Sequence, residues 1–413
     1  MKWKGIDSLH PRGLLWQPTT APNVQNDDIS RIRGQKPAPI AYDRLARIRG
    51  EAAAPSPILH VRMQLIAARM MESAFENFIS TQIGIPPGAR GQASTSQKHL
   101  REFLATEIDR DSTFPRVLQN ADSDFLGGSF ARHTKGWPLD DIDIFVPLDG
   151  LGLNYLWYGV PQPYTVVTDG VLQTNPLLLS PNRWMDGTLI SSVKLIREFE
   201  KVLRRKYPNT PVKDSEQAVN IQMSYGETEE ENGLGFDIVP CFRLRPHDPQ
   251  ENFFYLMPDG KDGWIHTNPR LDTQLNEELN QASNGLFRKA VKLVKYWNKE
   301  RFGGLLGSYY VELAIMRAFR LRSDLSTLGS TSRATALAFD ALQTAVFNGD
   351  QLSLFVKGAP PVKCGEVPPG ELLRLMVARN TAEKAVELER SGSIDEAAKH
   401  WHAVFGDSFT TDA

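Results

Sequence analysis

The stretch from Phe125 to Leu148 constrains this 413-residue chain more than any other, and it reads FLGGSFARHTKGWPLDDIDIFVPL. Asp141 and Asp143 flank one isoleucine and precede an apolar run. Alternate side chains of a β-strand point to the same face, so the two carboxylates are expected to share one face of a half-buried strand. Because neighbouring carboxylates repel each other unless a divalent cation lies between them, the pattern predicts a Mg²⁺ platform.

The residues before this strand, Gly127, Gly128 and Ser129, favour an anion site. Glycine lacks a Cβ, so backbone N–H groups can approach a phosphate closely. If Ser129 begins a helix, its N–H and hydroxyl join the positive end of the helix dipole. An ordinary turn would explain Gly-Gly-Ser alone, and Asp-x-Asp alone is equally unspecific. In combination, the two motifs favour a triphosphate bound beside a metal.

Gly128-Ser129-x-x-Arg132-x-Thr134, with Asp141-x-Asp143 beginning twelve residues after the serine, resembles the signature of polymerase-β-type nucleotidyltransferases. Within that superfamily the chain most resembles the bacterial cGAS/DncV-like nucleotidyltransferases, the CD-NTases. These enzymes are related to 2′-5′ oligoadenylate synthetase and make signalling oligonucleotides in anti-phage defence. His133 departs from the glycine usual in the family, and we expect this departure to affect only the local turn.

A third carboxylate, Asp237, lies in the apolar run at 236–242, which follows an alternating segment at 219–223 as the second strand of a hairpin would. A lone charge in such a run is costly unless it is paired or binds a metal. The resemblance implies the same role, because the family's third metal-binding carboxylate lies on a comparable strand. Asp141, Asp143 and Asp237 are therefore expected to hold two Mg²⁺ ions, with Mn²⁺ as an alternative.

A second match lies further along the chain, where Lys-Tyr-Trp beginning at Lys295 precedes Ser-Tyr-x-x-Glu beginning at Ser308. In the family the lysine and serine contact phosphates and the tyrosine stacks on a base, which implies these roles for Lys295, Ser308 and Tyr309. Lys292, Lys295 and Lys299 also form one positive stripe on a predicted helix. A solvated helix face would also explain that stripe, but the Lys-Tyr-Trp and Ser-Tyr-x-x-Glu match stands against this explanation.

Apolar residues at three- and four-residue steps predict helices at 58–81, 94–108, 187–207, from 284 onwards, and at 382–405 with a break at Gly392. The apolar face of the first is expected to consist of Met63, Ile66, Met70, Ala74 and Phe78. The first 57 residues contain seven prolines, so little regular structure is expected there.

The predicted organisation is a proline-rich extension at 1–57, a catalytic core with bracing helices at 58–265 and a C-terminal helical lobe at 266–413. The resemblance implies an α+β, bilobal fold, in which a polymerase-β-like sheet carries the aspartates and the helical lobe closes the cleft.

The composition limits the partners. A formal net charge of −2 does not favour a stable nucleic-acid partner. Cys241 and Cys364 are far apart, which excludes a Cys-rich zinc site and favours a reducing compartment. His266 has no second histidine or cysteine at metal spacing, so we expect it to be structural. No apolar run reaches the length of a membrane span, and we expect a cytoplasmic protein.

The expected activity is Mg²⁺-dependent synthesis of a cyclic oligonucleotide from ATP or GTP with release of pyrophosphate. The resemblance also implies an operon-encoded effector that senses the product. One alternative is an enzyme of the CCA-adding type that extends a polynucleotide end, which should have a strongly basic face. Another is a pseudoenzyme that binds nucleotide without turnover, but family relatives of that kind have lost acidic ligands that are present here.

Overall fold

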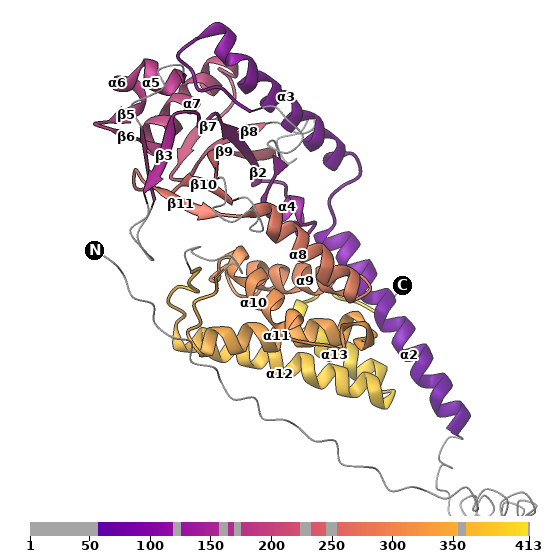
Figure 1. Cartoon of the computed structure of the whole chain (residues 1–413). Helices are drawn as coiled ribbons and strands as arrows, with labels where there is room; N and C mark the ends of the chain where they lie inside the picture. Colours follow the sequence, from indigo (N-terminus) through magenta and orange to yellow (C-terminus); the bar gives the residue numbers. More distant parts are fainter. Residues whose placement is uncertain are drawn as a thin grey trace, which may run out of the picture. The chain divides into compact units, whose positions relative to one another are not determined.

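The computed structural model describes residues 57–118, 125–156, 164–168, 175–223, 233–244, 254–353 and 361–411. The chain divides into two units, Met1–Ser56 and Pro57–Ala413, and all described residues lie in the second. The extension predicted at 1–57 thus falls almost wholly outside them. The second unit contains a sheet lobe, residues 89–267, and a helical lobe formed by residues 57–83 and 269–411 (Figure 1). This α+β, bilobal arrangement confirms the expected fold class.

The main sheet is mixed and is built around its longest strand, β9 (Leu234–Leu244). One edge of β9 pairs in parallel with β2 (Ile142–Leu148), while its other edge pairs antiparallel with β8 (Ala218–Met223) and β10 (Phe254–Pro258). The remaining strands pair antiparallel at the margins: β1 (Phe125–Leu126), β7 (Val212–Ser215) and β11 (Trp264–Thr267). The strands predicted at 219–223 and 236–242 are therefore confirmed as neighbours.

A smaller antiparallel sheet lies beside the main one, with the order β3 (Leu153–Leu156), β4 (Thr165–Thr168), β6 (Leu189–Ile190) and β5 (Met185–Asp186). The one-turn helices α5 (Pro176–Leu179) and α6 (Pro181–Trp184) precede β5. Helix α7 (Ser192–Lys206) begins later than the predicted residue 187, because the Ser191 side chain caps it by accepting a hydrogen bond from the Lys194 N–H.

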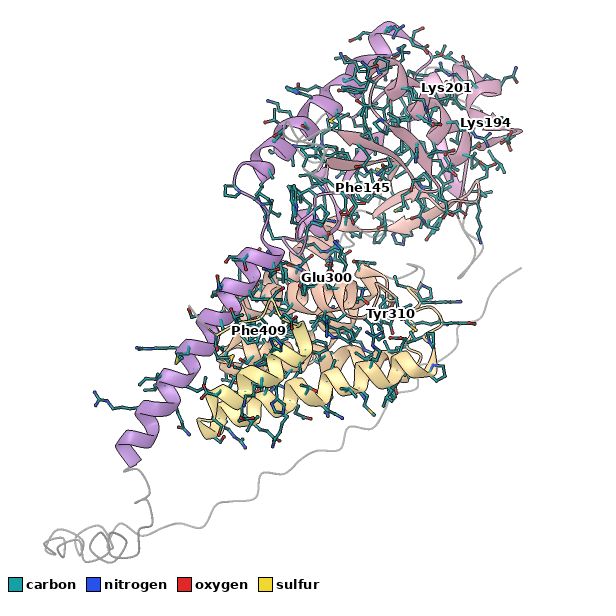
Figure 2. The ribbon with its side chains drawn as sticks, turned by 180° about the vertical axis from the view of Figure 1, so that it is seen from behind. Phe145, Lys194, Lys201, Glu300, Tyr310 and Phe409 are labelled. Carbon is teal, nitrogen blue, oxygen red and sulfur yellow. The ribbon has the colours of Figure 1, made fainter. Side chains whose placement is uncertain are left out.

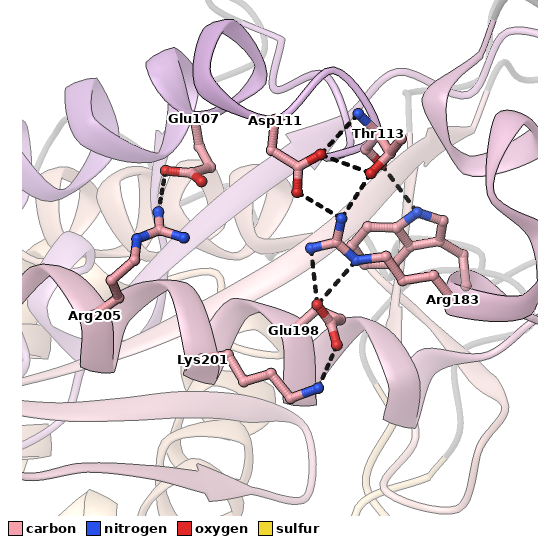
Figure 3. Close-up of polar contacts among 8 residues, drawn as sticks. Glu107, Asp111, Thr113, Arg183, Glu198, Lys201 and Arg205 are labelled. Carbon is pink, nitrogen blue, oxygen red and sulfur yellow. Dashed lines mark hydrogen bonds and ion pairs between the residues drawn. The ribbon is translucent and has the colours of Figure 1, made fainter.

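Helix α3 (Ala89–Arg110) is fastened to the sheet lobe by ion pairs at its C-terminal end (Figure 3). Arg205 of α7 lies 2.5 Å from Glu107, and Arg183 of α6 lies 2.6 Å from Asp111. Arg183 also pairs with Glu198 of α7 at 2.8 Å. These contacts hold α3, α6 and α7 together on the same side of the sheet.

The helical lobe contains α8 (Pro269–Ala282), α9 (Leu286–Glu300), α10 (Ser308–Arg320), a 3₁₀ turn (Leu325–Thr327), α11 (Thr331–Phe347), α12 (Pro369–Ser391) and α13 (Ile394–Phe405). Helical structure begins at Pro269, well before the predicted Asn284, because Asn268 caps α8 and proline suits its first turn. The predicted break at Gly392 is confirmed, since this glycine ends α12 with a φ of 84°.

Helix α2 (Pro57–Phe78), followed by a π-helical turn (Ile79–Ile83), differs from expectation in two ways. Its buried side chains, among them Phe75 and Phe78, pack against Trp401, Phe405 and Phe409, so α2 belongs to the helical lobe rather than to the catalytic core (Figures 1 and 2).

The apolar face predicted for α2 was also wrong in part. Ile66 and Met70 are 56% and 44% exposed, whereas Met71, Ala74, Phe75 and Phe78 are buried. The position of α13 and the chain after it selects this face, and local periodicity cannot specify that position.

No helix in the described part of the chain is long and apolar enough to cross a membrane.

Candidate active site

The structure brings the three predicted aspartates to one end of the β2–β9 pair. Asp143 on β2 lies directly opposite Asp237 on β9 in the parallel register. Asp141 immediately precedes β2 rather than lying within it. The two strands come from segments almost a hundred residues apart, so their pairing is what places the carboxylates together.

Burial and mutual repulsion perturb these carboxylates in the direction expected of crowded negative charges. Burial, with Asp237 and Asp141 nearby, raises the pKa of Asp143 to about 7. Burial also raises the pKa of Asp237, although a hydrogen bond from Asn220 opposes the shift. For Asp141, desolvation and the adjacent Asp140 raise the pKa, while Lys135 opposes them. The cations near Asp141, Asp143 and Asp237 therefore do not offset burial and repulsion, and the three carboxyl groups ionise less easily than exposed ones.

Gly128 permits the close approach of the glycine turn to Asp143. Its φ is +62°, and a Cβ added there would lie 1.6 Å from the Asp143 Oδ2 atom, so only glycine fits. The preceding Gly127 donates its backbone N–H to the Asp143 carbonyl at 3.0 Å. The helix after it, α4 (Gly128–Ala131), contains four residues, and Ser129 is its second. Such a short helix has little dipole, and the anion-binding role of Ser129 stays a prediction.

Two residues that were not singled out from the sequence position Asp237. The Asn220 Nδ2 atom donates to Asp237 Oδ1 at 2.8 Å, and Gln222 Nε2 donates to Asn220 Oδ1 at 2.8 Å. Both lie on β8, where they alternate with apolar residues. That alternation is visible in the sequence, but it equally describes a solvated face, so it does not by itself identify a supporting role.

Lys135 is a third residue that the sequence did not single out. Its ammonium group donates to Asp140 Oδ1 at 2.5 Å and also binds Asp141. Although burial would lower the pKa of Lys135, Asp141 and Asp140 raise it, so the lysine stays charged. Asp141 is thereby drawn to an internal cation. Accordingly, no group of three or more His, Cys, Asp or Glu side chains in the described ranges is arranged to hold a metal as it stands.

A cavity of about 370 Å³ lies beside Asp141 and is bounded by both lobes. Its walls come from the turn at 134–141, from residues 82–83 and from α9 and the start of α10. Lys295 and Ser308 line it as predicted for phosphate contacts, whereas Tyr309 is not part of the lining. Helix α10 begins at Ser308 after Gly307, which has no side chain to cap the first turn. The N-terminal N–H groups of this 13-residue helix are thus suited to an anion.

Beneath the cavity, Glu312 of α10 connects the lobes through a buried ion network. It is 1% exposed and accepts hydrogen bonds from Arg132 Nε at 2.8 Å and from Lys295 Nζ at 2.7 Å. Burial alone would raise the pKa of Glu312, but the two cations outweigh it and hold the pKa at about 2. Glu312 therefore remains ionised and fixes Lys295 at the cavity wall.

Tyr309, the predicted base-stacking residue, is held by two neighbours. Its hydroxyl donates to Asp272 Oδ2 at 2.6 Å, and the Arg132 guanidinium lies 5.2 Å from its ring centroid. One face of the ring is thus already covered, and its role in stacking stays a prediction.

Two histidines that the sequence raised have structural explanations. His133 has a φ of 60°, which explains why glycine is usual at this position, and its Nδ1 atom lies 2.9 Å from Arg90 Nη1, which donates to it. His266 lies against the Phe254 ring, at a centroid distance of 4.3 Å. Burial lowers the pKa of His266 to about 4, so the ring is neutral, as expected of a structural residue.

Comparison with known proteins agrees with this arrangement. No protein-family model matches the chain. The chain is 26% identical over 345 residues to a probable cyclic nucleotide synthase of Bacillus cereus strain VD146, which covers 82% of this chain and 97% of that protein. A local match of 40% identity over 52 residues, 12% of this chain and 15% of that protein, links it to the cyclic AMP-AMP-AMP synthase of an Acinetobacter strain.

Solved structures of E. coli MS115-1 CdnC share the fold. CdnC with ATP superposes with a TM-score of 0.54 at 16% identity, and CdnC in complex with HORMA-deltaN superposes with a TM-score of 0.53 at 17% identity. Each match covers 82% of this chain and 98% of CdnC.

The mixed sheet with its aspartates, the glycine turn and the helical lobe are arranged as the resemblance to the polymerase-β-type nucleotidyltransferases implies. The chain is similar to bacterial cyclic nucleotide synthases in sequence and to CdnC in fold. The individual roles of the site residues stay predictions, and the structure shows where each one lies.

Proposed function

We propose that this enzyme joins nucleoside triphosphates into a cyclic oligonucleotide and releases pyrophosphate at each step. The observation that carries the proposal is the Asp143–Asp237 pair, which Gly128 and Asn220 contact, next to Asp141, which lines the same cavity as Lys295. The names of the relatives, cyclic nucleotide synthase and cyclic AMP-AMP-AMP synthase, support the product class. ATP, GTP or both are the proposed substrates.

The aspartates fit Mg²⁺ by their chemistry. They supply hard oxygen donors, and the pKa of about 7 at Asp143 indicates a site that favours an added positive charge. We propose that Asp141, Asp143 and Asp237 hold two such ions, for which Mn²⁺ is an alternative. When bound, Mg²⁺ lowers the pKa of a ribose hydroxyl and neutralises charge on the triphosphate.

The residues of the chain position the reactants. We propose that Gly128, which lies against Asp143, and Ser129 offer backbone N–H groups to the triphosphate, while Ser308 lines the cavity at the N-terminus of α10. Lys295, held by Glu312, supplies a fixed positive charge to the phosphates. In-line displacement at the α-phosphate requires positioning and charge stabilisation more than covalent chemistry, so these groups suffice for the protein's part.

We further propose that the product acts as a second messenger in anti-phage signalling (CBASS) and is sensed by an operon-encoded effector. The support for this role is the resemblance of the chain to the CD-NTases. The cytoplasmic location expected from the sequence also stays a prediction.

Incubation of the full chain with labelled NTPs and Mg²⁺, followed by phosphatase treatment, tests the activity. A phosphatase-resistant small product supports the proposal. Label that enters only added RNA would instead support an enzyme that extends polynucleotide ends, and absence of any product would support a pseudoenzyme. In the same assay, Asp141→Asn combined with Asp143→Asn should abolish pyrophosphate release, whereas Asp214→Asn, at an exposed aspartate on β7, should retain it.

A further inference from the structure

Lys292 differs from the other lysines of the cavity. Four lysines line it, and three have a carboxylate neighbour: Lys135 pairs with Asp140 and Asp141, Lys295 with Glu312, and Lys299 lies 3.8 Å from Glu300. Lys292 makes no hydrogen bond or ion pair with any residue in the described ranges. Its charge is therefore the one at the cavity wall that the described protein does not neutralise.

The neighbours of Lys292 increase its positive surroundings. The residues three and four positions away on α9 are Arg288, Lys289, Lys295 and Tyr296, none of them acidic. Burial, with Arg90, Arg288 and Lys295 nearby, lowers the pKa of Lys292. Arg288 is itself occupied, since it lies 2.6 Å from Glu277. A half-buried cation among cations has no stabilising role in the free protein, and an anion in the cavity would supply the missing charge.

The position of Lys292 defines which anion fits. Lys292 lies one helical step before Lys295 on the same stripe of α9, about 4.5 Å along the helix axis. Lys295 and Ser308 line the same cavity next to Asp141. A ligand whose α-phosphate is near the aspartates and whose next phosphate reaches Lys295 can place one further phosphate at Lys292.

We propose that Lys292 binds the terminal phosphate of the nucleoside triphosphate whose inner phosphates are held at Lys295 and Ser308. This inference rests on the proposed function, because it assumes a triphosphate substrate. In this arrangement, Lys292 is the residue that makes the site bind a nucleoside triphosphate more tightly than a nucleoside diphosphate.

The test compares the binding of α,β-methylene-ATP and α,β-methylene-ADP, which are not cleaved at the α–β bond, by calorimetry with Mg²⁺. Loss of one charge-assisted hydrogen bond to phosphate corresponds to about a ten- to hundredfold loss of affinity. Lys292→Met should therefore weaken the triphosphate analogue by about that factor and leave the diphosphate analogue almost unchanged. Lys292→Arg should keep most of the preference, because it retains the charge.

Lys98→Met, at a side chain that is 71% exposed on α3, serves as the control for a lost surface charge and should change neither affinity. The thermal midpoint of Lys292→Met should not fall, since the substitution removes a charge from among cations; Lys292→Gln provides a second variant if it does. Equal weakening of both analogues, or an unchanged ratio of their affinities, would overturn the assignment. The analogue ratio is measured without turnover, so it is independent of whether the enzyme forms a cyclic product.

Discussion

Replacement of Asp143 by asparagine should stabilise the metal-free protein at alkaline pH. Burial and two neighbouring carboxylates raise the pKa of Asp143 from its ordinary value of 3.8 to about 7. At 1.36 kcal/mol for each pKa unit, this increase corresponds to about 4 kcal/mol of destabilisation when Asp143 is ionised. Asparagine has nearly the same shape and no charge, so Asp143→Asn should recover about 2 to 4 kcal/mol at pH 8.

The direction of the pH dependence follows from proton binding. Between pH 4 and 7 the folded protein retains a proton on Asp143 that the unfolded chain releases, so the free energy of unfolding decreases as the pH rises. The stability that the protonated Asp143 contributes is fully present below about pH 4 and is lost as the pH rises through 7. The advantage of Asp143→Asn should therefore be largest at pH 8, less than half as large at pH 5, and absent below about pH 4.

Urea denaturation in EDTA at both pH values measures this difference, with Asp214→Asn as the control for loss of an exposed carboxylate. Addition of Mg²⁺ should stabilise the native sequence and leave Asp143→Asn almost unchanged, because a ligand that binds only the folded state stabilises it. An Asp143→Asn protein that is less stable than the native one at pH 8, or equally affected at both pH values, would refute the electrostatic reasoning.

Four further changes test other parts of the site and of the chain. Asp237→Asn should reduce pyrophosphate release about a hundredfold, and Asn220→Ala about tenfold by releasing Asp237; full activity of Asp237→Asn would place the third carboxylate elsewhere. Glu312→Gln should lower the free energy of unfolding by about 3 to 5 kcal/mol, because it leaves Arg132 buried without its main counter-ion, and an unchanged urea midpoint would contradict this. Deletion of the first 57 residues should leave turnover unchanged, and an inactive or insoluble 58–413 protein would show that the segment is structural.

The strands that carry the three aspartates were predictable because their signals are local. Asp141-Ile142-Asp143 before an apolar run describes a half-buried strand whatever else the chain does, and a single charge at Asp237 within a second such run requires a partner. The glycine turn was predictable for the same reason, although the contact that requires Gly128 is with Asp143, fifteen residues further on. These short-range constraints underlie the motifs through which the chain resembles the nucleotidyltransferases.

Which residues far apart in the sequence form ion pairs or pack together was not predictable in the same way. Arg132 and Glu312 are 180 residues apart, and although each lies in a motif that resembles the family, neither motif shows that the two side chains pair with each other. The apolar stripe of α2 illustrates the same limit, since several faces of that helix are apolar enough to be buried and the packing of Phe405 against it selects one.

The sequence by itself determined the main strands and helices, where the glycine turn lies and which carboxylates stand on half-buried strands, because steric rules and side-chain periodicity act over a few residues. Only the tertiary structure decided the parallel register that sets Asp143 against Asp237, the hydrogen bond from Asn220, and the absence of an acidic partner for Lys292 in the described residues. Those features depend on which distant segments pack together, and packing is a property of the whole chain.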